Sequence, residues 1–185
     1  MRTYITLVLV IIIGIASLWF QEDSKEQVEG LSKTSERFPD YFMENFSVTN
    51  MRESGKPSYT LTAKRMQHFN DDDSAELEHP LIEFSQNGDS YTLQSTRAVY
   101  LKQQNLIHLY DDVVIHRKNV QEKSELSIYT DYLKINTATE IAENEHPSRL
   151  TTAQSELNTV GLILDNREGK LILKSQVKGV YKNAP

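Results

Sequence analysis

From Tyr41 onward, apolar and polar residues alternate with a period of two, and this feature limits the possible folds most. Between residues 58 and 63, Tyr59, Leu61 and Ala63 alternate with serine and threonine. A period of two places the apolar side chains of a segment on one face of a β-strand. No stretch after residue 40 keeps the i, i+3, i+4 spacing of an amphipathic helix. The sequence therefore predicts an all-β domain.

Short segments rich in Gly, Asn, Asp and Pro separate the alternating runs, as is typical of turns between antiparallel strands. They lie at residues 53–57, 86–89 and 165–169, and Asp111-Asp112 is predicted to form a further turn. The Glu-His-Pro sequences at His79 and His146 are predicted to mark the start of strands, because proline is tolerated there. Apolar residues also recur at one fixed interval, which is typical of stacked hairpins: Leu77, Leu109, Ile141 and Leu173.

Antiparallel strands with one apolar face bury that face by closing into a barrel or by folding into two layers. The interior is then either a solid core or a partly open apolar groove. The alternation of residues is compatible with both.

The N-terminal segment from Tyr4 to Phe20 is apolar and contains no charged residue. As a helix it would be about 25 Å long, close to the lower limit for crossing a bilayer. Arg2 precedes it and acidic residues follow it, so we expect a cytoplasmic N-terminus and an external domain. The alternative is a cleaved signal peptide, for which Gly14-Ile15-Ala16 is a weak cleavage site. We expect a transmembrane anchor at 1–20, a juxtamembrane linker at 21–38, a β-domain at 39–182 and a tail at 183–185.

The composition excludes several classes of protein. The net charge is −6 and the sequence shows no cluster of Lys and Arg, which argues against a nucleic-acid partner. There is no cysteine, so the domain has no disulfide, no thiolate metal site and no cysteine nucleophile.

No motif for catalysis or for a cofactor is present. The five histidines lack the spacing of a metal site, and Asp71-Asp72-Asp73 lacks the spacing and glycine of an EF-hand loop. Neither a P-loop nor a Gly-x-Ser-x-Gly elbow occurs. We therefore expect a protein that is not an enzyme and that uses no metal or other cofactor.

Several segments together resemble the LptC family of lipopolysaccharide-transport proteins. They are 40–46 (DYFMENF), 59–63 (YTLTA), 68–72 (HFNDD), 76–80 (ELEHP) and 130–136 (TDYLKIN). The single N-terminal anchor, the domain size and the absence of cysteine agree with this resemblance. One departure is the absence of a glycine between Arg149 and Asn158.

The resemblance implies a bitopic protein of the bacterial inner membrane, with a twisted, partly open antiparallel β-jellyroll in the periplasm. The jellyroll would hold the lipid A acyl chains of lipopolysaccharide. It implies docking at the N-terminal end to a transporter formed by LptB, LptF and LptG. At the C-terminal end, the edge strand would pair with the bridge protein LptA and pass the lipid on.

Ten residues are candidates for lipid contact, three from the family pattern and the others from strand parity. They are Phe46, Tyr59, Leu61, Leu77, Leu109, Val113, Ile115, Leu171, Leu173 and Tyr181. The main alternative is an anchored scaffold with a solid core that binds only proteins. A second alternative is a jellyroll enzyme acting on carbohydrate, which needs paired carboxylates in one cleft.

Overall fold

Antiparallel strands make up nearly all of the structure, a computed structural model that describes residues 37–86, 88–119 and 124–181. The residues from Pro39 form one compact unit. Its strands are β1 (Tyr41–Met51), β2 (Pro57–Phe69), β3 (Ser74–Glu78), β4 (Leu81–Gln86), β5 (Asp89–Gln94), β6 (Arg97–Leu101), β7 (Leu106–Asn119), β8 (Ser124–Asn136), β9 (Ile141–Thr152), β10 (Ser155–Asp165) and β11 (Lys170–Tyr181), with a 3₁₀ turn η1 (Lys102–Gln104). The predicted anchor and the tail lie outside the described residues. Inside them, we find no helix with the length and apolarity to cross a membrane.

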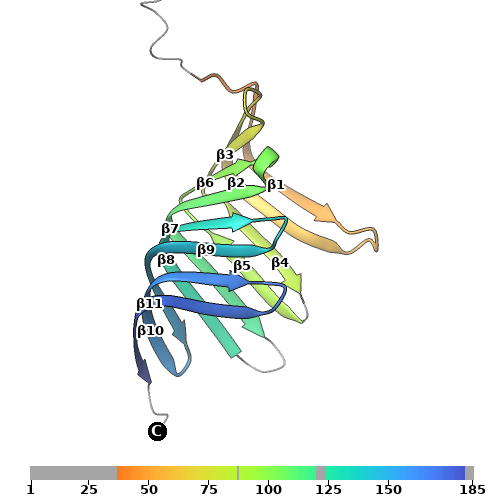
Figure 1. The fold of residues 1–185 in the computed structure, drawn as a ribbon. Coiled ribbons are helices and arrows are strands. Elements are labelled where there is room, and N and C mark those ends of the chain that lie inside the picture. Colours follow the sequence, from red (N-terminus) through yellow and green to blue (C-terminus); the bar gives the residue numbers. More distant parts are fainter. Residues whose placement is uncertain (1–36, 87, 120–123, 182–185) are drawn as a thin grey trace, which may run out of the picture. The chain divides into compact units, whose positions relative to one another are not determined.

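The strands form one sheet in the order β11-β10-β9-β8-β7-β5-β4-β2-β3-β6, and β1 pairs with β2. The long strands bend part-way along their length, at the left of Figure 1, and so contribute to two layers. Layer 1 contains β4, β5 and the segments 57–62, 114–119, 124–130, 148–152, 155–160 and 178–181. Layer 2 contains β3, β6 and the segments 65–69, 106–110, 133–136, 141–144, 162–165 and 170–175. The fold is therefore an antiparallel, jellyroll-like roll.

Irregular residues mark the bends. The register of β7 against β8 shifts between Tyr110 and Val113, where Asp111 and Asp112 both have positive φ. In β10 the shift falls at Gly161, whose φ is 80°, and in β11 Gln176 has a φ of 51°. Extra residues of this kind bend a strand and increase its twist. The predicted turn at Asp111-Asp112 is therefore wrong, because the chain continues through it as one strand.

The predicted strand start at His146 is also wrong, since Pro147 lies inside β9, next to the register shift against β10. Proline lacks the N–H that a regular ladder needs, and a bulge is where a sheet tolerates this. The prediction was correct at His79, where Pro80 immediately precedes β4. The turns predicted at 53–57 and 165–169 are confirmed, as they lie between β1 and β2 and between β10 and β11.

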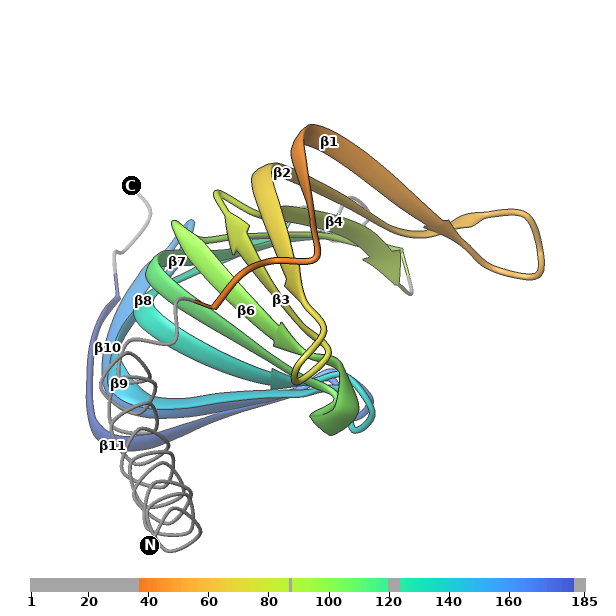
Figure 2. The same ribbon diagram turned by 90° about the horizontal axis from the view of Figure 1, so that it is seen from above.

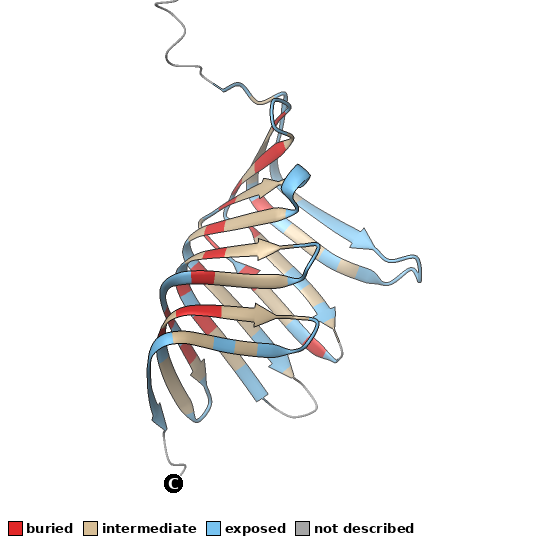
Figure 3. Ribbon diagram, in the orientation of Figure 1, coloured by how far each residue is buried: buried red, intermediate tan, exposed pale blue. Residues whose placement is uncertain are grey.

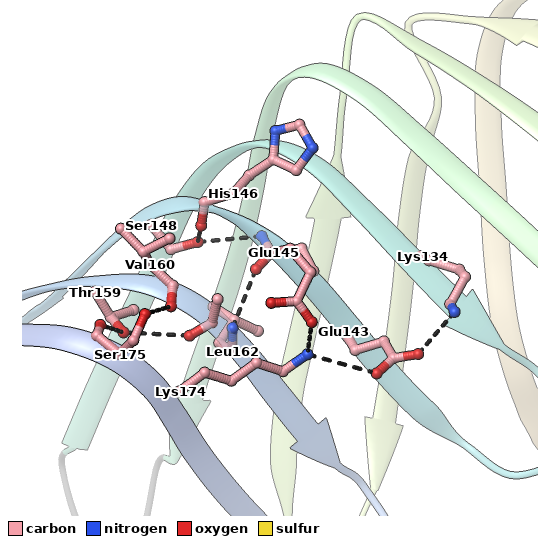
Figure 4. A network of polar contacts seen from close by, with 12 residues as sticks. Lys134, Glu143, Glu145, His146, Ser148, Thr159, Val160, Leu162, Lys174 and Ser175 are labelled. Atoms are coloured by element: carbon pink, nitrogen blue, oxygen red, sulfur yellow. Dashed lines mark hydrogen bonds and ion pairs between the residues drawn. The ribbon is translucent and has the colours of Figure 1, made fainter.

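Buried polar side chains complete the hydrogen bonding at the bends. Asn144, which is 3% exposed, donates from Nδ2 to Thr130 Oγ1 at 2.8 Å and to the carbonyl of Tyr132 at 2.9 Å. Its Oδ1 accepts from the backbone N–H of Leu162 at 3.1 Å. Figure 4 shows the neighbouring Ser148 and Thr159, whose hydroxyls donate to the carbonyls of His146 and Gly161. These contacts replace backbone pairs that the bulges remove.

The hydrophobic core lies in the angle between the two layers. Its most buried members flank the bends, as Figure 3 shows: Leu109, Val113, Ile128, Leu133, Leu150 and Leu162 are each at most 1% exposed. Aliphatic residues farther from the bends pack against this cluster but are only partly buried. The interior is thus dense at the bend and less covered toward the open side.

The Asn144 contacts can be tested by substitution. Asn144→Ala leaves the buried Leu162 N–H and the Tyr132 carbonyl without their partner. We expect it to lower the free energy of unfolding by about 2 to 3 kcal/mol. The measurement is chemical denaturation followed by the circular dichroism of the sheet. Asn158→Ala, on the exposed face of β10, is the control and should change stability by less than about 0.5 kcal/mol. Equal stabilities of the two variants would contradict the role given to Asn144.

Candidate functional site

The inner face of layer 1 carries an unbroken row of aliphatic side chains, one from each strand. The register joins each residue to the next, in the order Leu61, Ile82, Leu93, Ile115, Ile128, Leu150 and Leu157. Strands are spaced about 4.8 Å apart, so the row is roughly 30 Å long. Such a row arises because one parity of every strand is apolar.

Layer 2 carries a matching row on its inner face. Its order is Ala75, Tyr100, Ile107, Ile135, Ala142, Leu164 and Leu171. At their free rims the layers meet through a hydrogen bond from Asn166 Nδ2, after β10, to Gln86 Oε1, at the end of β4 (2.7 Å). Figure 2 shows the curved sheet from above, with the strands arranged around an interior. Two apolar rows, or walls, thus face the interior beside the core, and the space between them is called the groove here.

A hollow of about 310 Å³ lies between the walls at the C-terminal end of the sheet. Layer 1 supplies Leu126, Leu150 and Leu157 to its lining, and layer 2 supplies Leu171. Its polar lining residues are Arg117, Ser124, Glu125, Thr152 and Ser155. The hollow is therefore apolar between the layers and polar at its rim, which suits an apolar chain with a polar end.

The ten predicted residues fall at three depths. Leu77, Leu109 and Val113 belong to the buried core. Five are partly buried and pack against it: Phe46, Leu61, Ile115, Leu171 and Leu173. Tyr59 and Tyr181 are exposed, at 41% and 66%. Tyr59 is two residues from Leu61 on the same strand face, and Tyr181 pairs with Ser155, two residues from Leu157. The two tyrosines therefore lie at the rim of layer 1.

Several residues of the walls and the hollow were missed by the sequence reasoning. They include Ile82, Leu93, Leu126, Ile128, Ile135, Leu150, Leu157 and Leu164. The same alternation that identified Leu61 is present around Leu126 and Ile128 and could have identified these positions.

A charged cluster lies at the N-terminal end of the layer 2 row, where His68 pairs with Ala75. His68 Nδ1 lies 2.7 Å from Asp40 Oδ1, and His68 Nε2 lies 3.1 Å from Asp73 Oδ1. Tyr41 stacks on the imidazole with ring centroids 4.6 Å apart. The hydrogen bond to Asp40, and then that to Asp73, raise the pKa of His68 above its usual value. Lys102 Nζ binds Asp73 from η1 at 3.1 Å, so the cluster ties the start of β1 to β2, the β2–β3 turn and η1.

A second hollow, of about 490 Å³, has a largely polar lining. In it Arg149 lies over the ring of Tyr129 at 4.7 Å. Asp131 is the one carboxylate residue of this lining, so the hollow lacks the carboxylate pair that a glycosidase needs. In the described part of the chain, no three His, Asp or Glu side chains form a possible metal site.

Comparison with known proteins gives a family and a fold. The family described as "Lipopolysaccharide-assembly, LptC-related" matches residues 6–182. A similar solved structure is that of LptH from Pseudomonas aeruginosa, the LptA-homologous periplasmic component of the lipopolysaccharide transport device. It superposes with a TM-score of 0.54 at 6% sequence identity, covering 68% of this chain and 95% of LptH. At this identity the likeness shows a shared fold. No curated protein matches the sequence.

The His68 cluster predicts a pH dependence of stability. A raised folded-state pKa means that protonated His68 stabilises the fold below the unfolded pKa of about 6.5, and that this contribution is lost as the pH rises through the folded value. His68→Gln should therefore destabilise the protein more at pH 5.5 than at pH 8.5. The measurement is urea denaturation of both proteins at each pH. With Asp40 and Asp73 both changed to Asn, the effect of His68→Gln should no longer depend on pH. A pH-independent effect in the original background would contradict the assignment.

Proposed function

The chain belongs to the LptC-related family of lipopolysaccharide-assembly proteins, and we propose that its groove binds the acyl chains of lipopolysaccharide and relays them. In this proposal the lipid comes from an inner-membrane transporter and leaves to a periplasmic bridge protein. The observation that carries the proposal is the pair of facing apolar rows, with a leucine-lined hollow between them at the C-terminal end.

Apolar walls suit this cargo because exposing a methylene group to water costs about 0.8 kcal/mol. A groove that continues from protein to protein avoids this cost at every step of a transfer. The half-covered residues of the rows, and not the sealed core, are the ones an acyl chain can reach. We therefore assign lipid contact first to Leu61, Ile115, Leu157 and Leu171, and treat Leu77, Leu109 and Val113 as the floor of the groove.

The two outermost strands are candidates for contact with protein partners. Many of the exposed large apolar side chains lie on β1 and β11: Tyr41, Phe42, Val48, Met51, Ile172, Val177, Val180 and Tyr181. An open strand edge with apolar side chains is suited to strand addition by a partner. Lys174, which could guard the edge of β11, is instead bound by Glu143 and Glu145 (Figure 4). We propose that β11 pairs with LptA and that the β1 end docks on the transporter of LptB, LptF and LptG.

The proposed location is the bacterial inner membrane, with the domain at 39–182 in the periplasm. Tyr4 to Phe20 would form the single anchor and 21–38 the linker. The sequence carries no nucleotide-binding motif, so ATP hydrolysis in the transporter would drive the flow of lipid.

Photo-crosslinking in cells tests the groove. A photoreactive residue at Leu61, Ile115 or Leu157 should capture lipopolysaccharide, because these side chains lie on the inner face of layer 1. The measurement is the appearance of a lipopolysaccharide-reactive adduct on a gel. Asn158 and Lys118 are the controls, because both are exposed on the outer face of layer 1, Asn158 directly after Leu157 and Lys118 three residues after Ile115. If the inner positions capture no more lipid than the controls, the scaffold with a solid core is favoured.

Truncation tests the edge strand. Removing residues 177–185 deletes the part of β11 after the bend and leaves the part that covers Leu162 and Leu164. Binding of the bridge protein should be lost, while membrane insertion is kept. The measurement is co-purification of LptA with the full-length and truncated chains. Removal of 182–185 alone leaves all of β11 and should have no effect. Undiminished binding of LptA by the chain that lacks residues 177–185 would contradict the edge-pairing proposal.

A further inference from the structure

An arginine stands on the inner face of the groove, where the alternation of β7 otherwise places apolar residues. Arg117 has the same parity as Val113 and Ile115, and its register partners are Tyr91 in β5 and Leu126 in β8. Its side chain is 44% exposed and lines the leucine-lined hollow at the C-terminal end. It is therefore a cation at the rim of an apolar cavity.

The buried carboxylate of Asp89 binds one side of the Arg117 guanidinium, at Nε. Arg117 Nε donates to Asp89 Oδ2 at 2.5 Å, and Asp89 is only 5% exposed. Asn119 Nδ2 donates to the other oxygen, Asp89 Oδ1. Tyr91 also donates to Asp89 Oδ2, at 3.4 Å, and burial raises the pKa of this tyrosine. Asp89 thus has several donors and fixes the direction of the guanidinium.

The rest of the guanidinium is available to a ligand. Within the described residues, no oxygen accepts a hydrogen bond from either Nη group of Arg117. Glu125, the one carboxylate residue of the same lining, is paired with Lys118 at 3.1 Å. The two Nη groups carry four N–H donors in a planar fork, which matches the oxygens of a phosphate group.

We propose that Arg117 is an anion subsite of the groove, which binds the phosphate of an acylated headgroup while the acyl chains lie against the partly buried Leu126, Leu157 and Leu171. This inference rests on the proposed function and adds a polar determinant to it. In this arrangement the acyl chains lie in the hollow between the layers, and the negatively charged phosphate binds at its rim. The site favours an anionic amphiphile over an uncharged one of the same chain length.

The test is isothermal titration calorimetry on the full-length chain, kept soluble in an uncharged amphipol. The probes are decyl phosphate, decanol and inorganic phosphate. We expect decyl phosphate to bind about tenfold more tightly than decanol, because a hydrogen-bonded charge pair is added to the same apolar contact. Inorganic phosphate alone should not bind detectably at the concentrations that saturate decyl phosphate.

Substitutions of Arg117 test whether binding of the phosphate depends on the positive charge or on the planar shape of the guanidinium. Arg117→Gln should reduce the affinity for decyl phosphate to that for decanol and leave decanol binding unchanged. Arg117→Lys keeps the charge without the fork and should recover part of the preference. Lys178→Gln removes the same charge from the outer face of layer 1, where Lys178 pairs with Asn158, and should leave the preference intact.

Each result that would contradict the proposal identifies a different part of it as wrong. Equal binding of decyl phosphate and decanol by the unmodified chain would overturn the anion subsite and leave the groove standing. Binding of neither amphiphile would overturn the groove, and the subsite with it. Inorganic phosphate binding as tightly as decyl phosphate would show a site for free anions and overturn the link to a lipid headgroup. A loss of both amphiphiles in Arg117→Gln, with Lys178→Gln unaffected, would make Arg117 a support of the wall and overturn its role in recognition.

Discussion

The structure depends on bending long strands without leaving buried backbone groups unpaired. Each bulge removes regular pairs from the ladder, and a buried backbone group that is left unpaired costs free energy. Asn144 meets this constraint in β9, since one amide binds the Tyr132 carbonyl, the Thr130 hydroxyl and the Leu162 N–H. Thr159 serves the bend between β10 and β11 in the same way, donating to the carbonyls of Gly161 and Ser175. A single sheet can therefore fold over and face itself.

Because of this bend, the burial of the interior side chains decreases with distance from the bend. Close to the bend the two layers approach and exclude water, so Leu133 and Leu162 are fully buried. Farther from the bend, residues such as Leu164 and Leu171 are only partly covered. The dense part supplies most of the folding free energy, because burial and close packing are greatest there. In the proposed function, the outer part of the walls would bind and release the lipid without disturbing the core.

The alternation of residues was enough to predict the all-β class, several turns and which side chains point inward. It could not predict depth, because Leu109 and Leu171 have the same residue type and the same parity but lie at different distances from the bend. The bends themselves were also missed. Asp111-Asp112 has the composition of a turn, and whether such a pair reverses the chain or only bends a strand depends on partners far away in sequence. Asn144 and Arg117 look like ordinary polar residues in the sequence, and only the register shows that they face the interior.

The last strand shows how a groove wall could continue into a neighbouring protein. The layer 1 row ends at Leu157, whose partner in β11 is Gly179. A Cβ at this glycine would lie 2.4 Å from Leu157 Cδ2, so the end of the Leu157 side chain lies over Gly179 and would have to shift to admit a larger residue. Leu157 is therefore the last side chain of the row before the sheet edge. A strand added beside β11 could bring its own apolar residue to the edge next to Gly179 and extend the row. Edge pairing and lipid transfer would then be two consequences of the same strand geometry.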